Sequence, residues 1–335
     1  MQPSRRAFLF GRQRPRTRWE AFIQGLERGV EGRVRHDANQ PGRATLIPAH
    51  RADARHARAL CAEFGVRLRL MSWADDRLNK RGALSDHEDG AFNKTGAGAF
   101  DLNPVESERL SQQIDGPVLS MDTRLLTGLS PGAIAGHVIA EPGCRLGDLV
   151  AAGLNQFRDA PPDCSVGVWL ATAHDWRPGA TAESGVVAID VLLSDGTMET
   201  LGPFGECDSR PLRSATVQKL IPFLFQLAAG ADARACRSAD VWPCRYRLDA
   251  MLPAAPAEVN LAHLLLGHHG ELAWVEAVTL VVSEEVWSSV SSHTDAVPSA
   301  HREAPETIAM AQRLQRQIKD AFDPSGLFLD LGAGV

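Results

Sequence analysis

The adjacent histidines His268 and His269 are the residues whose types most readily suggest proton-transfer chemistry in this sequence. Histidine changes its charge near neutral pH, so it can serve as a general acid or base. Both histidines stand between Gly267 and Gly270, however, and glycines at this spacing are typical of a tight turn. A turn would leave both side chains hydrogen-bonded and inert, and we favour this interpretation over a catalytic one.

A ligand could approach the backbone most closely at residues 161–172, which read Pro-Pro-Asp-Cys-Ser-Val-Gly-Val-Trp-Leu-Ala-Thr. A proline-rich turn followed by small residues keeps bulky side chains out of the way, so we expect a binding loop here. Residues 186–193 are apolar and β-branched enough to form a strand that is buried on both faces. The strand runs into Asp195-Gly196, a dipeptide typical of a type I′ hairpin turn.

The composition favours a folded chain that does not bind nucleic acid. The 335 residues are 44% hydrophobic, which fits one large domain or two subdomains. The net charge is −6, and residues 1–35 carry nine Arg and three Glu, so this head is +6 and the remaining chain is −12. No apolar run reaches the roughly 18 residues that a membrane span needs, so none is predicted.

Six cysteines are scattered along the chain without any C-x-x-C pair. They are Cys61, Cys144, Cys164, Cys207, Cys236 and Cys244. The spacing encodes neither an iron–sulfur cluster nor a zinc knuckle. In a chain of this length it favours free thiols in a reducing compartment.

The basic head contains Ser4-Arg5-Arg6-Ala7-Phe8-Leu9, which resembles the twin-arginine export consensus. A signal peptide also needs an apolar stretch, and here glycine and arginines begin again at Gly11-Arg12. We therefore expect residues 1–42 to form a retained basic arm of a cytoplasmic protein, with periplasmic export as the alternative. Such an arm is either a solvated tail or a docking site.

Hydrophobic periodicity places the elements that would position these residues. It predicts strands at 44–47, 66–71, 118–121 and 137–141, and helices over 54–64, 146–154, 217–227 and 308–322. Pro222 must kink or start the third helix. Residues 77–117 have little core content and are expected to form a surface excursion.

Four separated segments resemble the FAD-binding domain of the vanillyl-alcohol oxidase and p-cresol methylhydroxylase (PCMH) family. They are the Pro-Gly turn and helix of 141–149, the loop and hairpin of 161–196, the glycine turn and strand of 264–280, and the tail of 319–328. The tail reads Lys-Asp-Ala-Phe-Asp-Pro-Ser-Gly-Leu-Phe and is similar to that of flavin-linked 2-hydroxy-acid dehydrogenases. The closest form is the FAD-binding subunit of bacterial glycolate oxidase.

The resemblance implies an α+β, two-subdomain PCMH-type FAD-binding fold. Its parts would be a first subdomain at 43–120, a second at 121–283, and a linker with a C-terminal helix at 284–335. FAD would lie noncovalently between the subdomains. The implied contacts are Pro162, Asp163, Ser165, Val166, Gly167, Ala171, Thr172, Gly185 and Val187. The family's first glycine-rich loop reads Ser72-Trp73-Ala74-Asp75-Asp76 here, so FAD binding is expected to be weak or lost.

The family's substrate-binding cap domain is missing, because only a short polar stretch occupies 283–304. The resemblance therefore implies an oxidoreductase subunit that oxidises a 2-hydroxy acid of the glycolate or D-lactate type and passes electrons to an iron–sulfur partner subunit. His174, Asp175 and Arg177 are the local candidates for the base and for the arginine that holds the substrate carboxylate. The alternative is a degenerate flavin-domain protein that acts as a non-catalytic structural or assembly subunit.

Overall fold

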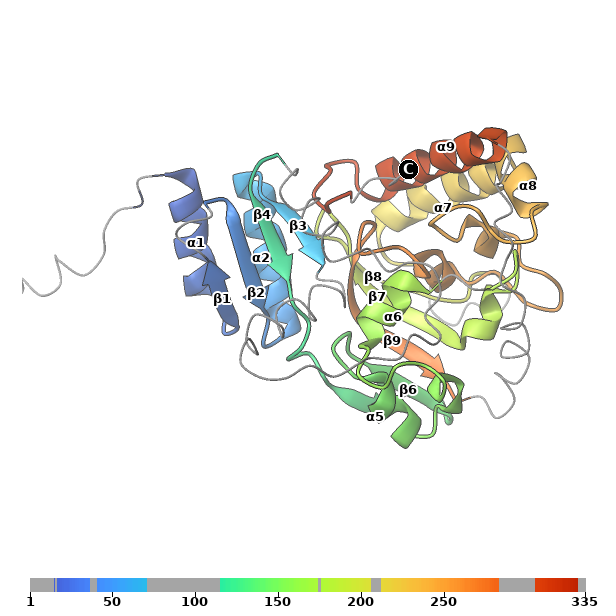
Figure 1. The fold of residues 1–335 in the computed structure, drawn as a ribbon, viewed down its shortest axis with the longest axis horizontal. Coiled ribbons are helices and arrows are strands. Elements are labelled where there is room, and N and C mark those ends of the chain that lie inside the picture. The colour runs from blue at the N-terminus through green and yellow to red at the C-terminus, as the bar shows by residue number, and fades with distance from the viewer. Residues whose placement is uncertain are drawn as a thin grey trace, which may run out of the picture.

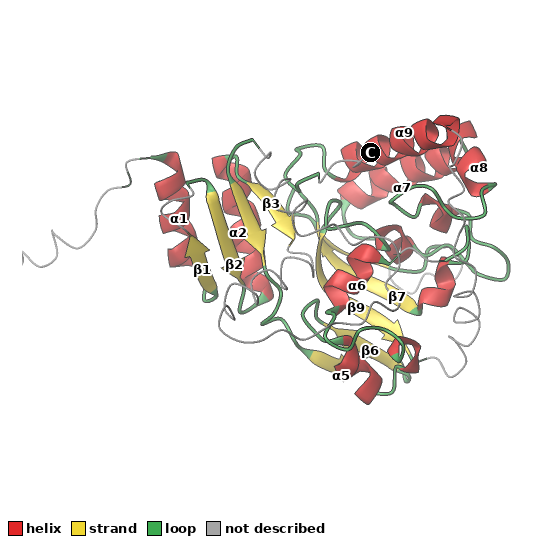
Figure 2. Ribbon diagram, viewed as in Figure 1, coloured by secondary structure: helices red, strands yellow, loops and turns green. Residues whose placement is uncertain are grey.

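A computed structural model describes residues 15, 17–36, 41–70, 115–173, 176–205, 212–282 and 305–330. Within these residues helices and strands are mixed, and the strands form two separate sheets (Figure 1, Figure 2). The expected α+β class is therefore confirmed. We call the part built on the N-terminal sheet the first unit and the part built on the other sheet the second unit. None of the described helices combines the length and apolar character that crossing a membrane requires.

The first unit is a mixed sheet with the strand order β1-β2-β4-β3. Its strands are β1 (Arg33–His36), β2 (Arg43–Ile47), β3 (Arg67–Leu70) and β4 (Val118–Met121). Strands β2 and β3 run parallel to β4, and β1 runs antiparallel to β2. Helix α2 (Arg51–Phe64) connects β2 to β3 and ends at Gly65, which adopts the left-handed conformation (φ 68°). The expected β-α-β pattern is confirmed.

Part of the segment expected to be a separate basic arm belongs to the first unit instead. Helix α1 (Arg18–Gly29) begins at Thr17, whose hydroxyl accepts a hydrogen bond from the Glu20 amide (3.0 Å). It buries Phe22, Ile23 and Leu26, whose spacing puts them on one face of the helix. Charge counting overlooked this apolar face because it considers only the charged residues of the segment. The twin-arginine-like stretch at Ser4 to Leu9 lies outside the described residues.

The carboxylate of Asp53 ties the entry of β1 to the start of α2. It accepts hydrogen bonds from the backbone amides of Glu31 (3.0 Å), Gly32 (2.9 Å) and Ala49 (2.8 Å). Burial raises the pKa of this carboxyl, but the surrounding backbone amides outweigh that effect and hold its pKa below the usual value. Asp53 therefore stays ionised and fixes two loops at once.

The second unit is an antiparallel sheet with the strand order β5-β6-β9-β7-β8. Its strands are β5 (Leu129–Pro131), β6 (His137–Ala140), β7 (Val186–Leu192), β8 (Met198–Leu201) and β9 (Trp274–Val281). Its helices are α5 (Leu146–Ala151), α6 (Val166–Thr172), α7 (Ala215–Ala228), α8 (Ala231–Arg237) and α9 (Pro305–Phe322). Short 3-10 turns lie at Asn155–Phe157, Thr181–Ser184, Leu248–Met251 and Leu261–Leu265. Pro222 lies inside α7.

The hairpin between β7 and β8 forms, but the type I′ prediction for its turn is wrong. That turn needs positive φ at two central residues, and here only Gly196 has it (φ 91°). The Gly196 amide donates to the Leu193 carbonyl (3.0 Å), and Leu193 donates to Thr197 (2.9 Å). The turn is therefore type I followed by a left-handed glycine. Asp195 favours this form because its carboxylate accepts from the Thr197 amide (2.8 Å).

One face of α2 joins the two units through the arginines Arg51, Arg55 and Arg58. Their partners in the second unit are, in order, Glu141 (3.1 Å), Glu276 (2.6 and 2.5 Å) and the Ser194 carbonyl (2.7 Å). Spacings of four and three residues put these side chains on one helical face. The contact is polar at each of these points, so the two units are held in a defined register.

The end of the chain adds to both units. Helix α9 packs beside α8 in the second unit (Figure 1). The segment after it pairs with β3, because Leu68 donates to the Leu327 carbonyl (2.8 Å) and Leu329 donates to the Leu68 carbonyl (2.7 Å). Phe328 is buried in the core of the first unit together with Trp274 of β9. The tail therefore fastens the first sheet to the second unit.

Candidate functional site

The predicted binding loop is one half of a symmetric pair of turns. Residues 142–147 and 162–167 both read Pro-x-Cys-x-(Leu or Val)-Gly, and each sequence leads into a helix, α5 or α6. The amides of Leu146 and Val166 donate to the carbonyls of Cys164 (2.9 Å) and Cys144 (2.8 Å). Gly147 and Gly167 donate in the same reciprocal way to Pro162 (3.0 Å) and Pro142 (2.8 Å). The repeated sequence, with its spacing of 20 residues, was the signal that could have revealed this pairing.

The binding loop expected at 161–172 is wrong for its second half, because Val166–Thr172 is helix α6. Ser165 caps it by accepting from the Val168 amide (3.3 Å). A side chain at Gly167 would place its Cβ 2.9 Å from the Cβ of Pro142 and 3.0 Å from the Pro142 carbonyl oxygen. The glycine is therefore explained by close packing between the two turns, and not by the approach of a ligand.

The other predicted contacts near α6 also have partners within the chain. Asp163 is exposed and forms an ion pair with Arg145 (2.6 Å). The Thr172 hydroxyl donates to the Val168 carbonyl (2.9 Å), and the Ala171 carbonyl accepts from the His269 amide (2.9 Å). Pro162 is exposed at the turn.

Gly185 and Val187, the predicted contacts at the start of β7, are held by neighbouring strands and turns. The Gly185 carbonyl accepts from the Val281 amide (2.9 Å), and the Val187 carbonyl accepts from the Asn260 side chain (2.9 Å). Gly185 adopts a left-handed conformation (φ 71°), and a Cβ there would lie 3.0 Å from the side-chain nitrogen of Gln156. The structure thus uses Gly185 as a turn before the strand.

Arg177, the candidate for holding a substrate carboxylate, is exposed, but the residues around it are anchored in the interior. Its carbonyl accepts from the Arg247 guanidinium (3.1 Å), which also donates to the Trp176 carbonyl (2.9 Å). Arg247 is itself paired with Asp249 (2.7 Å), and both side chains are fully buried. Asp249 accepts in turn from the Gly179 amide (2.7 Å). His174 and Asp175, the candidate bases, lie outside the described residues.

The two adjacent histidines lie in a turn, as the favoured interpretation expected. Gly267 donates to the Leu170 carbonyl (2.8 Å), so the turn caps the end of α6. His268 is fully buried and its Nδ1 contacts the Leu265 carbonyl (2.6 Å). Burial lowers the pKa of His268 to about 4, although the hydrogen bond to Leu265 opposes this effect. His268 is therefore neutral near pH 7.

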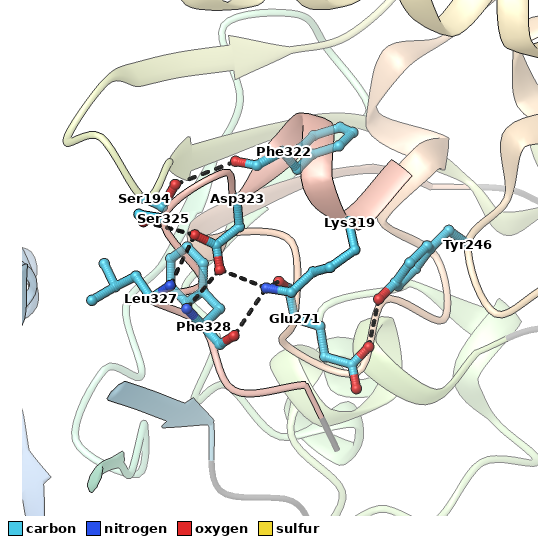
Figure 3. Close-up of polar contacts among 9 residues, drawn as sticks. All are labelled: Ser194, Tyr246, Glu271, Lys319, Phe322, Asp323, Ser325, Leu327 and Phe328. Carbon is cyan, nitrogen blue, oxygen red and sulfur yellow. Dashed lines mark hydrogen bonds and ion pairs between the residues drawn. The ribbon is translucent and has the colours of Figure 1, made fainter. Parts of the chain in front are cut away.

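A buried polar cluster joins α9 to this turn, and sequence reasoning singled out its tail motif but not its contacts (Figure 3). The Lys319 ammonium contacts the Asp323 carboxylate (2.5 Å), the Glu271 carbonyl (2.7 Å) and the Phe328 carbonyl (2.9 Å). The Glu271 carboxylate has no exposed surface and accepts from the Tyr246 hydroxyl (2.5 Å). Burial, and then the negative charge of Glu271, raises the pKa of Tyr246. We call Lys319, Asp323 and Phe328 of the tail motif, together with their partners Glu271 and Tyr246, the tail clamp.

The described residues do not fit the phosphates of FAD at the predicted loop. Phosphate binding needs unpaired backbone amides, and the amides of Val166, Gly167 and Val168 already donate within the chain. The first loop, at 72–76, lies outside the described residues. In the described part of the chain there is also no cluster of His, Cys, Asp and Glu that could hold a metal ion.

Comparisons with known proteins find similar solved structures only. No family model matches, and no curated protein matches. Wild-type BBE-like 1 of Physcomitrella patens has 11% identity and a TM-score of 0.38, over 78% of this chain and 44% of that one. A xylooligosaccharide oxidase of Myceliophthora thermophila has 13% identity and a TM-score of 0.39, over 78% and 42%. An alkyldihydroxyacetonephosphate synthase has 14% identity and a TM-score of 0.36, over 71% and 32%. The chain thus spans less than half the length of each structure.

Proposed function

We propose that this protein is a subunit of a flavin-dependent oxidoreductase, built on a PCMH-type FAD-binding domain of the kind found in the FAD-binding subunit of glycolate oxidase. The proposal rests on one observation about the four segments that resemble this family. Although they are spread from residue 141 to residue 328, they are joined to one another in space.

Hydrogen bonds connect the four segments in sequence order. Gly167 donates to the Pro142 carbonyl (2.8 Å), which joins the first segment to the second. Gly267 donates to the Leu170 carbonyl (2.8 Å), which joins the second to the third. Lys319 donates to the Glu271 carbonyl (2.7 Å), which joins the third to the tail. Four chance similarities would not be expected to meet in a single assembly, so their convergence supports common ancestry with a flavin domain.

Any flavin would be bound noncovalently under this proposal. Covalent attachment through cysteine requires the thiolate form. Burial raises the pKa of Cys144 and of Cys164 to about 11, so both are thiols near pH 7. Since the amides at the second turn are already used, FAD affinity should be low.

The proposed substrate class is a 2-hydroxy acid, and Arg177 supports it. The Arg247 guanidinium holds the backbone here by donating to the Trp176 and Arg177 carbonyls. The Arg177 side chain itself is exposed and has no hydrogen-bond partner among the described residues. A guanidinium in this state can receive a carboxylate in two parallel hydrogen bonds. We also propose that a partner subunit of the iron–sulfur type takes the electrons. We further propose a cytoplasmic location.

A second candidate function is a non-catalytic structural or assembly subunit derived from a flavin domain. The observation that favours it is the reciprocal pairing of the turns at 142–147 and 162–167, which leaves the α6 amides occupied. In this case the fold would persist while cofactor binding is lost.

Titration of the purified full chain with FAD separates the two candidates. Saturable quenching of flavin fluorescence, with all flavin released into the supernatant on acid precipitation, is the result expected for the oxidoreductase. Flavin that stays with the pellet would contradict noncovalent binding. No binding at any FAD concentration would favour the structural subunit.

The substrate proposal is tested on the flavin-loaded protein. Anaerobic addition of glycolate or D-lactate should bleach the flavin absorbance in the wild type. The Arg177→Ala variant should need a concentration at least ten times higher, because one bidentate ion pair is worth about 1.5–3 kcal/mol. Arg213→Ala, at another exposed arginine, is the control. Equal behaviour of the two variants would refute a role for Arg177.

A further inference from the structure

Two buried cysteines in the second unit lie with their sulfur atoms in contact. Cys236 stands near the end of α8, and Cys244 lies in the irregular segment that follows. Their Sγ atoms are 3.8 Å apart. Both residues belong to the core of the second unit, with exposed fractions of 0% and 4%. Both are reduced thiols in this structure.

The pair differs from Cys144 and Cys164 in that its two thiols contact each other. Cys144 and Cys164 each direct their thiol to a backbone carbonyl, of Gly128 and Ser165 respectively. Cys236, in contrast, interacts electrostatically with Arg313, which a bidentate ion pair with Asp232 (2.9 Å each) holds beside α8. A nearby guanidinium favours the thiolate, which is the reactive form of cysteine, but burial opposes it, as at Cys61, whose pKa is raised although Arg58 lies nearby.

The chain between the two cysteines is short and partly exposed. It contains Val241, whose side chain is 60% exposed, and Trp242, whose ring nitrogen donates to the Tyr246 carbonyl (2.9 Å). A disulfide has a sulfur–sulfur distance near 2.05 Å, so the two sulfurs must approach by about 1.8 Å. Because Cys236, Trp242 and Cys244 all belong to the core, this approach requires a small local rearrangement there, next to the exposed residues Asp240 and Val241.

We propose that Cys236 and Cys244 form a reversible intramolecular disulfide when the protein meets a small-molecule disulfide such as oxidised glutathione. One thiolate attacks a sulfur of the oxidant and releases the first glutathione thiolate. The other thiolate then attacks the mixed disulfide and releases the second. The protein loses two hydrogen atoms and two electrons, and one glutathione disulfide becomes two glutathione thiols.

The proposed disulfide would affect the residues after Cys244, which make the buried contacts described above. Cys244 directly precedes Arg245 and Tyr246, whose side chains hold the Glu271 carboxylate at 2.5 Å each. Arg247 follows and anchors the turn that carries Arg177. Oxidation therefore pulls on the segment that links the tail clamp to this turn.

The test uses the full-length protein with the Cys207→Ser substitution, so that five of the six cysteines remain. After incubation of the folded protein with oxidised glutathione, thiol titration in denaturant should count three thiols instead of five. Tryptic digestion should give residues 235–237 linked to residues 238–245. Dithiothreitol should restore all five thiols.

Cysteine variants distinguish a specific disulfide between Cys236 and Cys244 from non-specific oxidation of the thiols. Adding Cys236→Ser or Cys244→Ser should abolish the linked peptide, whereas adding Cys61→Ser, at another buried cysteine, should leave it intact. The proposal is overturned if all five thiols survive in the folded protein, if other cysteines are linked instead, or if glutathione remains attached to either residue in the unsubstituted pair.

Discussion

Two histidines of the second unit are buried as neutral rings, and each has a fixed local partner. His263 contacts the Thr181 hydroxyl (3.2 Å) through Nδ1 and the Val186 carbonyl (2.8 Å) through Nε2. Since a carbonyl only accepts, Nε2 carries the proton and Nδ1 accepts from the threonine. Burial lowers the pKa of His263 to about 4, as it does for His268. The two side chains therefore serve packing and hydrogen bonding at neutral pH.

Depressed histidine pKa values make the protein acid-sensitive. The unfolded chain binds protons at these residues below about pH 6.5, whereas the folded chain does so only near pH 4. The free energy of unfolding should therefore fall as the pH drops from about 6.5 to about 4. His268→Gln should reduce this slope by close to one proton, as measured by urea unfolding at several pH values. His50→Gln, at an exposed histidine, is the control, and an unchanged slope in His268→Gln would contradict the argument.

At the scale of elements, apolar sequence patterns correctly predicted strands that contribute buried side chains. The strands at 118–121, 137–141 and 186–193 were expected because their residues are apolar, and they form β4, β6 and β7. Strand β1 was not expected, because its sequence Arg-Val-Arg-His is mostly charged and it pairs only at the edge of the sheet. Local sequence carries little signal for an edge strand of this kind.

The predicted site shows where single-sequence reasoning failed. The small residues within 161–172 were interpreted as part of a binding loop, but a long-range partner decides their structure. The amides of Val166 and Gly167 donate to carbonyls of the turn at 142–147, and the residues from Val166 onward form α6. That pairing depends on a contact 20 residues away, which residue propensities cannot reveal. Arg247 and Asp249, the anchor of the Arg177 turn, were missed for the same reason.

The close contact between the two turns gives a prediction for Gly167. Gly167→Ala would force a Cβ to within 3.0 Å of the Pro142 carbonyl oxygen, so it should lower the free energy of unfolding by about 1–3 kcal/mol. Gly25→Ala in α1 is the matched control, because its Cβ would meet only Leu60, at 3.6 Å. It should raise stability by up to about 1 kcal/mol, since alanine favours the helix. The free energies of unfolding of both variants are measured by chemical denaturation. Equal decreases for Gly167→Ala and Gly25→Ala would contradict the packing argument.

At the scale of the whole molecule, two groups of polar contacts among the described residues help to join the units. One is the arginine face of α2, and the other is the tail clamp (Figure 3). The clamp buries the Asp323 carboxylate completely, and this carboxylate also accepts from the amides of Leu327 (3.0 Å) and Phe328 (2.8 Å). These bonds bend the chain after α9 toward β3.

Removing the ammonium should therefore destabilise both units together. Lys319→Met removes the cation that pairs with the buried Asp323 carboxylate and the hydrogen bonds to two carbonyls, so the free energy of unfolding should fall by about 3–5 kcal/mol. Lys219→Met, at an exposed lysine of α7, should change it by less than about 0.5 kcal/mol. Calorimetry provides the measurement, and a Lys319→Met transition at the wild-type temperature would disprove the importance of the clamp.

The pairing of Leu68 with Phe328 also has a consequence during synthesis on the ribosome. The two residues are 260 positions apart, so at about 5–20 residues per second the nascent β3 waits roughly 13–50 seconds for its partner. Throughout that time the edge of β3 and the apolar surface that Phe328 covers are open to other chains. The protein should therefore depend on chaperones while it is being made, and a ribosome stalled before Lys319 should hold a product that aggregates on release.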